Sequence, residues 1–234
     1  MKNMNTMTLL AAGTCAMIAA SAANAAVVAG WTMTTAVPAS TTGSSYSYGI
    51  ADQGAQTTGS VLTGSHASAA TVWSSPAGNG STYSLSANTW GVGDYFQVTL
   101  DTRGYGDISI SWDQTRSSSG PSVFNLTMSV DGGANFTTVN AGYSVVQAGG
   151  SGTGTTSWST SSTGAQTGFT TTTIAGSAAA QKASVIFRFV NTSTVAVGGT
   201  NRIDNILVTG NAVPAPGAIA LLGVAGLVGA RRRR

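Results

Sequence analysis

Few side chains in this sequence could carry out acid–base or nucleophilic chemistry, and they are widely spaced. His66 is the only histidine among 234 residues, and it lies in the polar stretch 63–68 without a carboxylate beside it. A Ser-His-Asp arrangement needs such a carboxylate to orient the imidazole. We therefore interpret His66 as a surface loop residue. A zinc site would need cysteines or several histidines, and the only cysteine is Cys15.

Aspartates are the remaining candidates for catalysis, because the chain has seven Asp and no Glu. Asp101, Asp107 and Asp113 fall on the polar faces of neighbouring predicted strands. A glycoside hydrolase needs only two carboxyl groups at the right separation, but a solvated sheet face accounts for these residues equally well. We expect no catalytic residue and no enzymatic activity, and we keep a glycoside hydrolase with an Asp pair as the weakest of three hypotheses.

Aromatic side chains could bind carbohydrate, since an exposed ring can stack on a sugar while nearby polar groups bond its hydroxyls. The candidates for stacking are Trp31, Trp73, Trp90, Tyr105 and Trp158. Each could equally be a core or loop-anchoring aromatic, and we favour that alternative.

Calcium is the only ion that the sequence suggests. A β-sandwich often seats Ca²⁺ among Asp side chains and loop carbonyls, and Asp94 or Asp204 could contribute to such a site. No EF-hand-like spacing supports it, so we expect no cofactor and no other metal.

Hydrophobic and polar residues alternate along several segments, which is the pattern of half-buried β-strands. The residues Phe96, Val98 and Leu100 share one face of a predicted strand over 95–101. Further strands are predicted over 107–113, 123–130, 185–190 and 203–208. Half-buried strands in succession favour an antiparallel sheet with one face on a core. We predict an all-β fold, an antiparallel, jelly-roll-like β-sandwich that forms a single domain over residues 26–212.

The connections between these strands are rich in small polar residues. Long surface loops are predicted over 41–45, 74–81 and 149–176 from their Ser, Thr and Gly content. A tight hairpin is predicted over 129–136, because Asp131-Gly132-Gly133 has the residues that such turns need. This octet resembles the Asp-box hairpin of secreted β proteins, a structural motif.

The N-terminal 25 residues have the layout of a secretory signal peptide. Lys2 is followed by an uncharged stretch over 9–20 and by small residues that end in Ala23-Asn24-Ala25. This A-x-A pattern predicts cleavage between Ala25 and Ala26. The chain is therefore expected to be exported, and its mature form is expected to lack cysteine because Cys15 is removed.

Three elements follow one another at the C-terminal end. The motif Val213-Pro214-Ala215-Pro216 leads into an apolar run over 217–230, and the cluster Arg231, Arg232, Arg233 and Arg234 follows. The 14 apolar residues would reach about 21 Å as a helix against a hydrocarbon core of about 30 Å. We therefore predict a short transmembrane sorting helix, better suited to transient retention than to permanent anchoring. The layout resembles the PEP-CTERM sorting signal of Gram-negative and related bacteria, with Ala215 where the family has Glu.

Several expectations come from this resemblance. PEP-CTERM proteins are secreted through a signal peptide, held at the inner membrane and processed by an exosortase, and they generally accompany exopolysaccharide and biofilm production. The resemblance implies that an exosortase cleaves near Pro214–Pro216, that the terminal arginines stay on the cytoplasmic side, and that the protein reaches the cell surface or extracellular matrix. A plain C-terminal tail anchor is the alternative.

The charge balance argues against a nucleic-acid partner. The whole chain has a formal net charge of +3, but Lys2 and the four terminal arginines account for this excess. The body over 26–212 holds five basic and seven acidic residues, a net charge of minus two, with no basic stripe. We predict a non-enzymatic, exported surface or matrix protein associated with exopolysaccharide. A carbohydrate-binding module that uses exposed aromatics is the second hypothesis.

Overall fold

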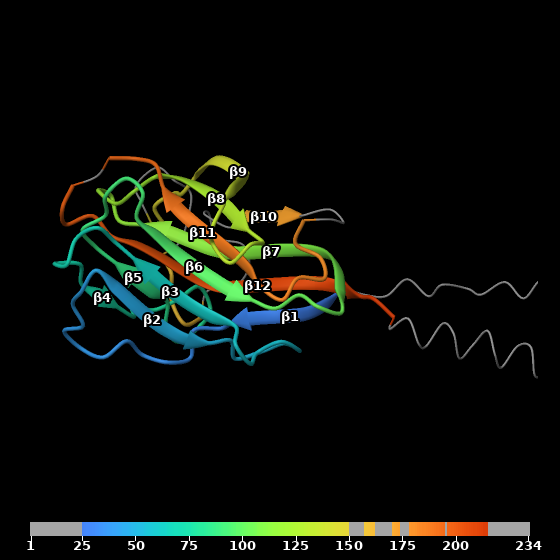
Figure 1. Ribbon diagram of the computed structural model, residues 1–234. Helices are drawn as coiled ribbons and strands as arrows, with labels where there is room; N and C mark the ends of the chain where they lie inside the picture. Colours follow the sequence, from blue (N-terminus) through green and yellow to red (C-terminus); the bar gives the residue numbers. More distant parts are fainter. Residues whose placement is uncertain (1–24, 150–156, 162–169, 174–177, 195, 215–234) are drawn as a thin grey trace, which may run out of the picture.

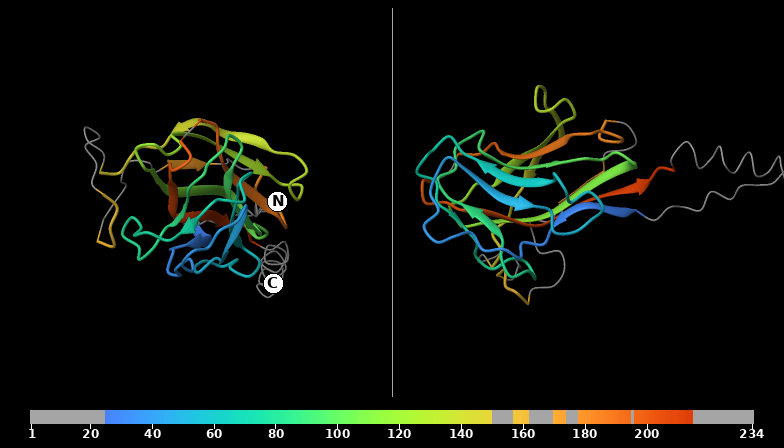
Figure 2. Two further views of the ribbon diagram at one scale, coloured as in Figure 1. Left: turned by 90° about the vertical axis from the view of Figure 1, so that its left-hand side faces the viewer. Right: turned by 60° about the horizontal axis from the view of Figure 1, so that its bottom comes forward.

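The computed structural model describes residues 25–149, 157–161, 170–173, 178–194 and 196–214. Over these residues the chain forms twelve β-strands and no helix. The strands make two six-stranded sheets that pack face to face as a sandwich (Figures 1 and 2). All strand pairs within these sheets are antiparallel. The predicted all-β antiparallel sandwich is thus confirmed.

Each sheet draws strands from the whole length of the domain. The first sheet holds β1 (Ala26–Trp31), β4 (Trp73–Ser74), β5 (Leu85–Ala87), β7 (Tyr105–Arg116), β10 (Thr170–Thr173) and β12 (Asn201–Ala212). Its order is β10-β7-β12-β5-β4, and β1 also pairs with β12. The second sheet holds β2 (Ser45–Ile50), β3 (Val61–Ser65), β6 (Tyr95–Leu100), β8 (Val123–Ser129), β9 (Thr137–Ser144) and β11 (Val185–Asn191). Its order is β2-β3-β6-β11-β8-β9.

The strands from β5 to β12 pair in a nested manner. The innermost pair is β8 with β9, followed outward by β7 with β10, β6 with β11 and β5 with β12. Successive pairs fall in opposite sheets. The chain therefore resembles one long hairpin that is folded over so that its four pairs alternate between the two layers.

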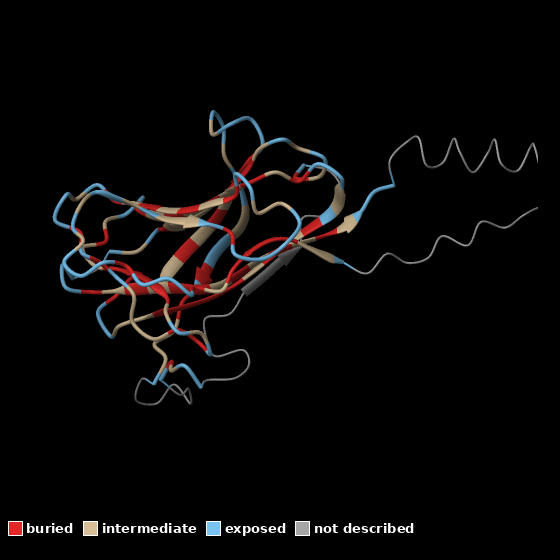
Figure 3. Cartoon of the chain, turned by 90° about the horizontal axis from the view of Figure 1, so that it is seen from below, coloured by how far each residue is buried: buried red, intermediate tan, exposed pale blue. Residues whose placement is uncertain are grey.

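The core lies between the sheets and is built by the alternation that the sequence shows. Buried side chains on β6, β7 and β8 are separated by half-buried ones that face outward, as the alternating colours in Figure 3 show. The large, fully buried side chains include Trp31, Trp73, Trp112, Phe96, Phe124, Phe187 and Phe189. Full burial of each such ring is worth about 1.5–3 kcal/mol, so this layer is the main source of stability in a fold without disulfides.

Both ends of the described chain leave the sandwich at the same end. The strand β1 begins at Ala26, opposite Gly210 on β12, and β12 ends at Ala212. Figure 1 shows the start of β1 and the end of β12 side by side. The described residues include no helix long and apolar enough to cross a membrane. Among the predicted sorting residues, Ala23, Ala215, Pro216 and the four terminal arginines lie outside the described residues.

Candidate functional site

A polar row crosses the outer face of the second sheet from one edge strand to the other. Its members lie opposite one another in register on six adjacent strands, in the order Ser47, Thr63, Gln97, Arg188, Thr127 and Thr138. None of the six is buried. With adjacent strands about 4.8 Å apart, the row spans about 24 Å. It offers hydroxyl, amide and guanidinium groups along a line, which is the chemistry that bonds sugar hydroxyls.

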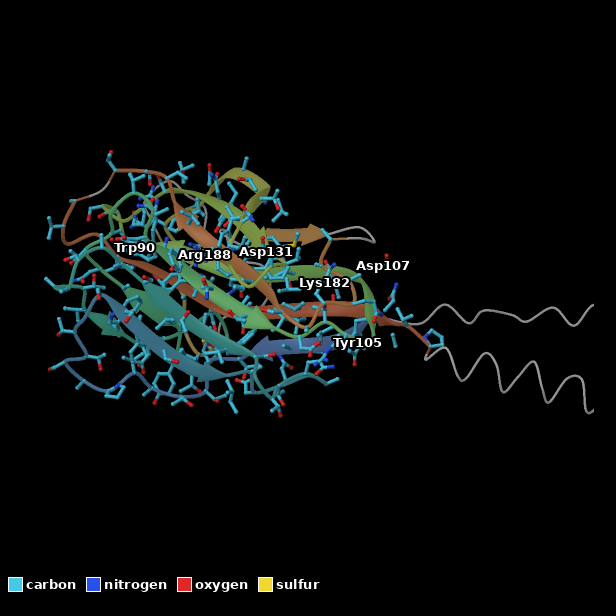
Figure 4. All side chains as sticks on the ribbon, in the orientation of Figure 1. Trp90, Tyr105, Asp107, Asp131, Lys182 and Arg188 are labelled. Atoms are coloured by element: carbon cyan, nitrogen blue, oxygen red, sulfur yellow. The ribbon has the colours of Figure 1, made fainter. Side chains whose placement is uncertain are left out.

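The centre of this row is a stack of three side chains. The Arg188 guanidinium lies over the Tyr95 ring, 4.3 Å from its centroid, and over the Phe136 ring, 4.0 Å from its centroid. Arg188 Nε donates a hydrogen bond of 2.6 Å to Gln97 Oε1. These contacts fix the guanidinium in the middle of the sheet, where Figure 4 labels it. Cation–π contacts of this kind contribute about 0.5–1 kcal/mol each at exposed sites.

The free donors of this stack belong to Arg188. In the described residues, Nε–H is the only guanidinium group of Arg188 that makes a hydrogen bond, and no carboxylate is paired with it. Both terminal NH₂ groups are thus available to a ligand. A planar guanidinium held between two rings is preorganised to donate paired hydrogen bonds to vicinal oxygens.

The β8–β9 hairpin positions Phe136 in the stack. Gly132 and Gly133 adopt φ of 74° and 94°, values that a residue with a side chain rarely adopts. Asp131 accepts hydrogen bonds from the Ser129 hydroxyl, at 2.6 Å, and from the backbone N–H of Asn135, at 3.0 Å. These bonds, led by that from Ser129, hold the pKa of Asp131 well below its usual range. The hairpin predicted over 129–136 is confirmed.

The structure corrects the choice of stacking aromatics. Trp31, Trp73 and Trp90 are buried in the core, and their indole N–H groups donate to the carbonyls of Gly49, Gly43 and Ala87. Trp158 is buried under the Arg202 guanidinium, at 5.1 Å. Tyr105 is half-buried against the core, at the end of the sandwich opposite Trp90 (Figure 4). Because stacking on sugar requires an exposed ring face, the alternative of a core or loop-anchoring aromatic holds for the four tryptophans.

Two aromatic side chains of the described residues lie on the outer surface, and both were missing from the sequence-derived candidates. Among the described residues, Tyr95 and Phe136 are the aromatic side chains that are neither buried nor packed against the core. The alternation in 95–100 already places Tyr95 with Gln97 on the polar face. Phe136 is the last residue of the hairpin octet 129–136, three positions after Gly133, and its place at a surface turn was the available signal.

His66 is not a surface residue, contrary to expectation. Its imidazole is fully buried and lies between the rings of Trp73 and Trp90, at centroid distances of 4.9 Å and 4.2 Å. Its Nδ1 is 3.6 Å from Asp94 Oδ2, so a carboxylate does lie beside it. Burial lowers the pKa of His66, while the Asp94 charge opposes this shift. The ring is therefore a buried, neutral element of the core at physiological pH.

The three aspartates considered for catalysis do not form a pair. Asp107 and Asp113 lie on the same strand, six residues and therefore about 20 Å apart, whereas glycosidase carboxyls are about 5–9.5 Å apart. Asp101 follows β6 in the other sheet and forms an exposed ion pair with Arg103. Asp107 instead accepts a hydrogen bond from Asn211 at 3.0 Å.

A different acidic pair, Asp113 and Asp204, lies face to face across β7 and β12. Asp204 Oδ2 accepts bonds of 2.6 Å from both the Asn79 N–H and the Ser81 hydroxyl, and its Oδ1 accepts from the N–H of Asn205. Asp113 Oδ2 accepts from the side-chain amides of Asn79 and Asn205. Burial raises the pKa of Asp113, and burial raises that of Asp204 to about 6. This network ties the 75–84 loop onto the first sheet.

Neither aspartate considered for calcium has both oxygens turned to an open site. The carboxylate of Asp204 is surrounded by the N–H and O–H donors named above. Asp94 accepts from the backbone N–H groups of Ala67, at 2.8 Å, and Gly91, at 2.5 Å. The described residues contain no group of three His, Cys, Asp or Glu side chains that could hold a metal ion.

Comparison with known proteins gives structural likenesses only. No family model and no curated protein matches the chain. The CBM22-1 xylan-binding domain from Paenibacillus barcinonensis is 13% identical at a TM-score of 0.39, covering 76% of this chain and 99% of that chain. The K3 cleaved adhesin domain of Lys-gingipain from Porphyromonas gingivalis is 14% identical at a TM-score of 0.42, covering 80% and 99%.

The N-terminal cellulose-binding domain of β-1,4-glucanase C from Cellulomonas fimi is also similar. It is 16% identical at a TM-score of 0.29, covering 73% of this chain and 90% of that chain. None of these three exceeds a TM-score of 0.42, so function has to be inferred from the residues of this chain itself.

Proposed function

We propose that this chain is an exported, non-catalytic surface or matrix protein that binds polysaccharide across the outer face of its second sheet. The observation that carries the proposal is the polar row from Ser47 to Thr138 with the Tyr95–Arg188–Phe136 stack at its centre. A row of about 24 Å matches an extended oligosaccharide better than a single sugar. Its hydroxyls, amide and guanidinium can replace the water that a glycan loses on binding.

Binding at this face would be polar and moderate in strength. The rings of Tyr95 and Phe136 are partly covered by Arg188, so stacking contributes less than on a bare aromatic platform. The two free NH₂ groups of Arg188 are the strongest donors of the row, because hydrogen bonds from charged groups contribute about 1.5–3 kcal/mol each. Arg188 is therefore the residue on which affinity depends most.

The nested strand order supports the finer description of the sandwich as a jelly roll. A jelly roll folds eight consecutive strands into two four-stranded sheets through two Greek keys. The strands β5 to β12 give the orders β5-β12-β7-β10 and β6-β11-β8-β9, which is the arrangement of four nested pairs wrapped over two layers. The strands β1 to β4 extend both sheets.

Export and sorting form the second half of the proposal. The resemblance of the C-terminal segment to PEP-CTERM signals supports transient retention at the inner membrane, cleavage by an exosortase near Pro214, and release to the cell surface or matrix. The end of β12 leaves the sandwich beside the start of β1, at one end of the domain. Retention through this end would leave the outer face of the second sheet open to polysaccharide.

Binding measurements on Arg188→Gln test the proposed site. Wild-type protein would be screened against immobilised polysaccharides and oligosaccharides, both neutral and acidic, and the best ligand titrated calorimetrically. Arg188→Gln should weaken binding about tenfold or more, since it removes charged donors. Arg103→Gln is the matched control, because Arg103 is exposed and paired with Asp101 away from the row. Retention of no glycan, or wild-type affinity in Arg188→Gln, would overturn the proposal.

A further inference from the structure

A recess lies on the outer side of the first sheet, on the opposite side of the sandwich from the polar row. Its volume is about 500 Å³, within the usual range of about 300–1,000 Å³ for small-ligand sites. Two arginines, Arg116 and Arg202, line it together with hydroxyl side chains, and no acidic side chain is among the described residues that line it. We call it the arginine recess. The hydroxyls are those of Ser74, Ser86, Ser117, Ser118 and Thr200.

Arg202 is held in place with most of its donors unused. It faces outward from β12, opposite Thr115 on β7 and Ser86 on β5. Its guanidinium covers the Trp158 ring at 5.1 Å, and its Nη1 donates to the Ala77 carbonyl at 3.0 Å. No other hydrogen bond involves its guanidinium in the described residues, so Nε and Nη2 remain available.

Arg116 is fixed in a similar way at the end of β7. Its Nε donates to the Val145 carbonyl at 2.9 Å, and its Nη1 donates to the carbonyls of Ser117 and Ser118 at 3.1 Å and 2.9 Å. Its Nη2 has no protein acceptor in the described residues. Backbone carbonyls orient a guanidinium without neutralising it, so both arginines keep their positive charge for a ligand.

The charge of the recess differs from that of the domain. The body of the chain carries a net charge of minus two, yet the described lining of this recess has two cationic side chains and no anionic one. The negative charge of Asp204 acts on the Arg202 guanidinium and raises its pKa against the effect of burial. The oxygens of Asp204, however, already accept hydrogen bonds from Asn79, Ser81 and Asn205. An anion that enters the recess would therefore meet preorganised, uncompensated donors.

We propose that the arginine recess binds the carboxylate of a uronic acid unit in an acidic polysaccharide. This inference rests on the proposed function, because it names the chemical class of the polymer that the domain would bind. Guanidinium groups bind carboxylates through paired N–H bonds, and the surrounding serine and threonine hydroxyls suit the hydroxyls of the sugar ring. The recess brings two guanidinium groups to one anion, whereas the polar row has the single guanidinium of Arg188 among neutral hydroxyl and amide groups.

The test compares an oligogalacturonate hexamer with the same hexamer as its methyl ester, so that only the charge differs. Wild-type protein should bind the acid form about ten- to a hundredfold more tightly, and the difference should shrink at high salt. Arg116→Gln and Arg202→Gln should each remove most of this preference. Melting curves would show whether the variants fold, which matters for Arg202 because of its packing on Trp158.

Ser118→Asp tests the same point without a change in the core. Ser118 is exposed and lines the recess, so a carboxylate there would repel the ligand and should weaken acid-hexamer binding by about tenfold or more. Ser119→Asp is the matched control, since Ser119 is exposed and adjacent but does not line the recess. It should cause a clearly smaller loss.

Each outcome separates the recess from the polar row. Equal affinity for acid and ester, or acid-hexamer binding that survives Ser118→Asp and both arginine variants, overturns the inference while leaving the proposed function intact. Equal affinity for a sulfated oligosaccharide that contains no uronic acid overturns the assignment to a carboxylate. Loss in Ser118→Asp, with the acid preference retained in Arg188→Gln, supports the recess. If neither the acid nor the ester binds, the inference fails, and a neutral glycan that binds through Arg188 would still support the row.

Discussion

Asp204 should make the stability of this domain depend on pH in an unusual direction. Burial raises the pKa of Asp204 to about 6 in the folded chain, against about 3.9 for an aspartate in an unfolded chain. The folded state therefore holds this proton more tightly than the unfolded state. Its contribution is fully present below about pH 4 and is lost as pH rises through about 6, and the difference of about two pKa units corresponds to about 3 kcal/mol.

Comparison of wild type with Asp204→Asn isolates this effect. Urea unfolding would be measured for both proteins between about pH 3.5 and 7.5, and the difference in unfolding free energy plotted against pH. Wild type should gain about 3 kcal/mol relative to the variant as pH falls from 7 to 4. His66, whose pKa is lowered by burial, is present in both proteins, so its titration largely cancels. The Asp113 charge contributes to the raised pKa of Asp204, so the difference reports the titration of Asp204 as it faces Asp113. A difference that is flat, or that grows as pH rises, would refute the reasoning.

Two further predictions concern packing and processing. Gly64→Ala should lower the unfolding free energy by about 1–3 kcal/mol, because a Cβ at Gly64 would overlap the Trp73 ring, whereas Gly198→Ala, at a position open on all sides, should have little effect. Intact-mass measurement of protein recovered from the cell surface or medium should show a chain that begins at Ala26 and lacks the arginine-terminated segment; a chain that retains Arg234 in the membrane fraction would indicate a tail anchor instead.

The strands could be predicted from sequence because each carries its own alternation. The run from Tyr95 to Leu100 separates core from surface within six residues, and the structure follows it. The pairing of β6 with β11 could not be predicted in the same way. It joins Tyr95 to Val190 and Gln97 to Arg188 across more than 90 residues of chain, and no local pattern specifies a partner that is so distant.

The burial of His66 and Asp113 could not be predicted from the sequence, for a related reason. His66 lies in a stretch without apolar periodicity, and Trp73 and Trp90, which bury it, come from other segments. Asp113 does face away from the core of the sandwich, as its position in the alternation predicts, but the loop that carries Asn79 folds over it. Alternation tells which side of a sheet a residue takes, whereas only tertiary structure tells whether a loop covers that side.

The positions of the two candidate surfaces bear on what a matrix protein of this fold would do. The polar row lies on the outer face of the second sheet and the arginine recess on the outer side of the first, so the sandwich separates them. The described chain enters at β1 and leaves at β12 at one end of the domain. A domain with one binding face can only coat a polymer, while one with two opposed faces can join two polymer chains, and each contact then raises the effective concentration for the other. If both surfaces bind polysaccharide as proposed, their opposed placement favours cross-linking of polymer chains over simple attachment to one chain.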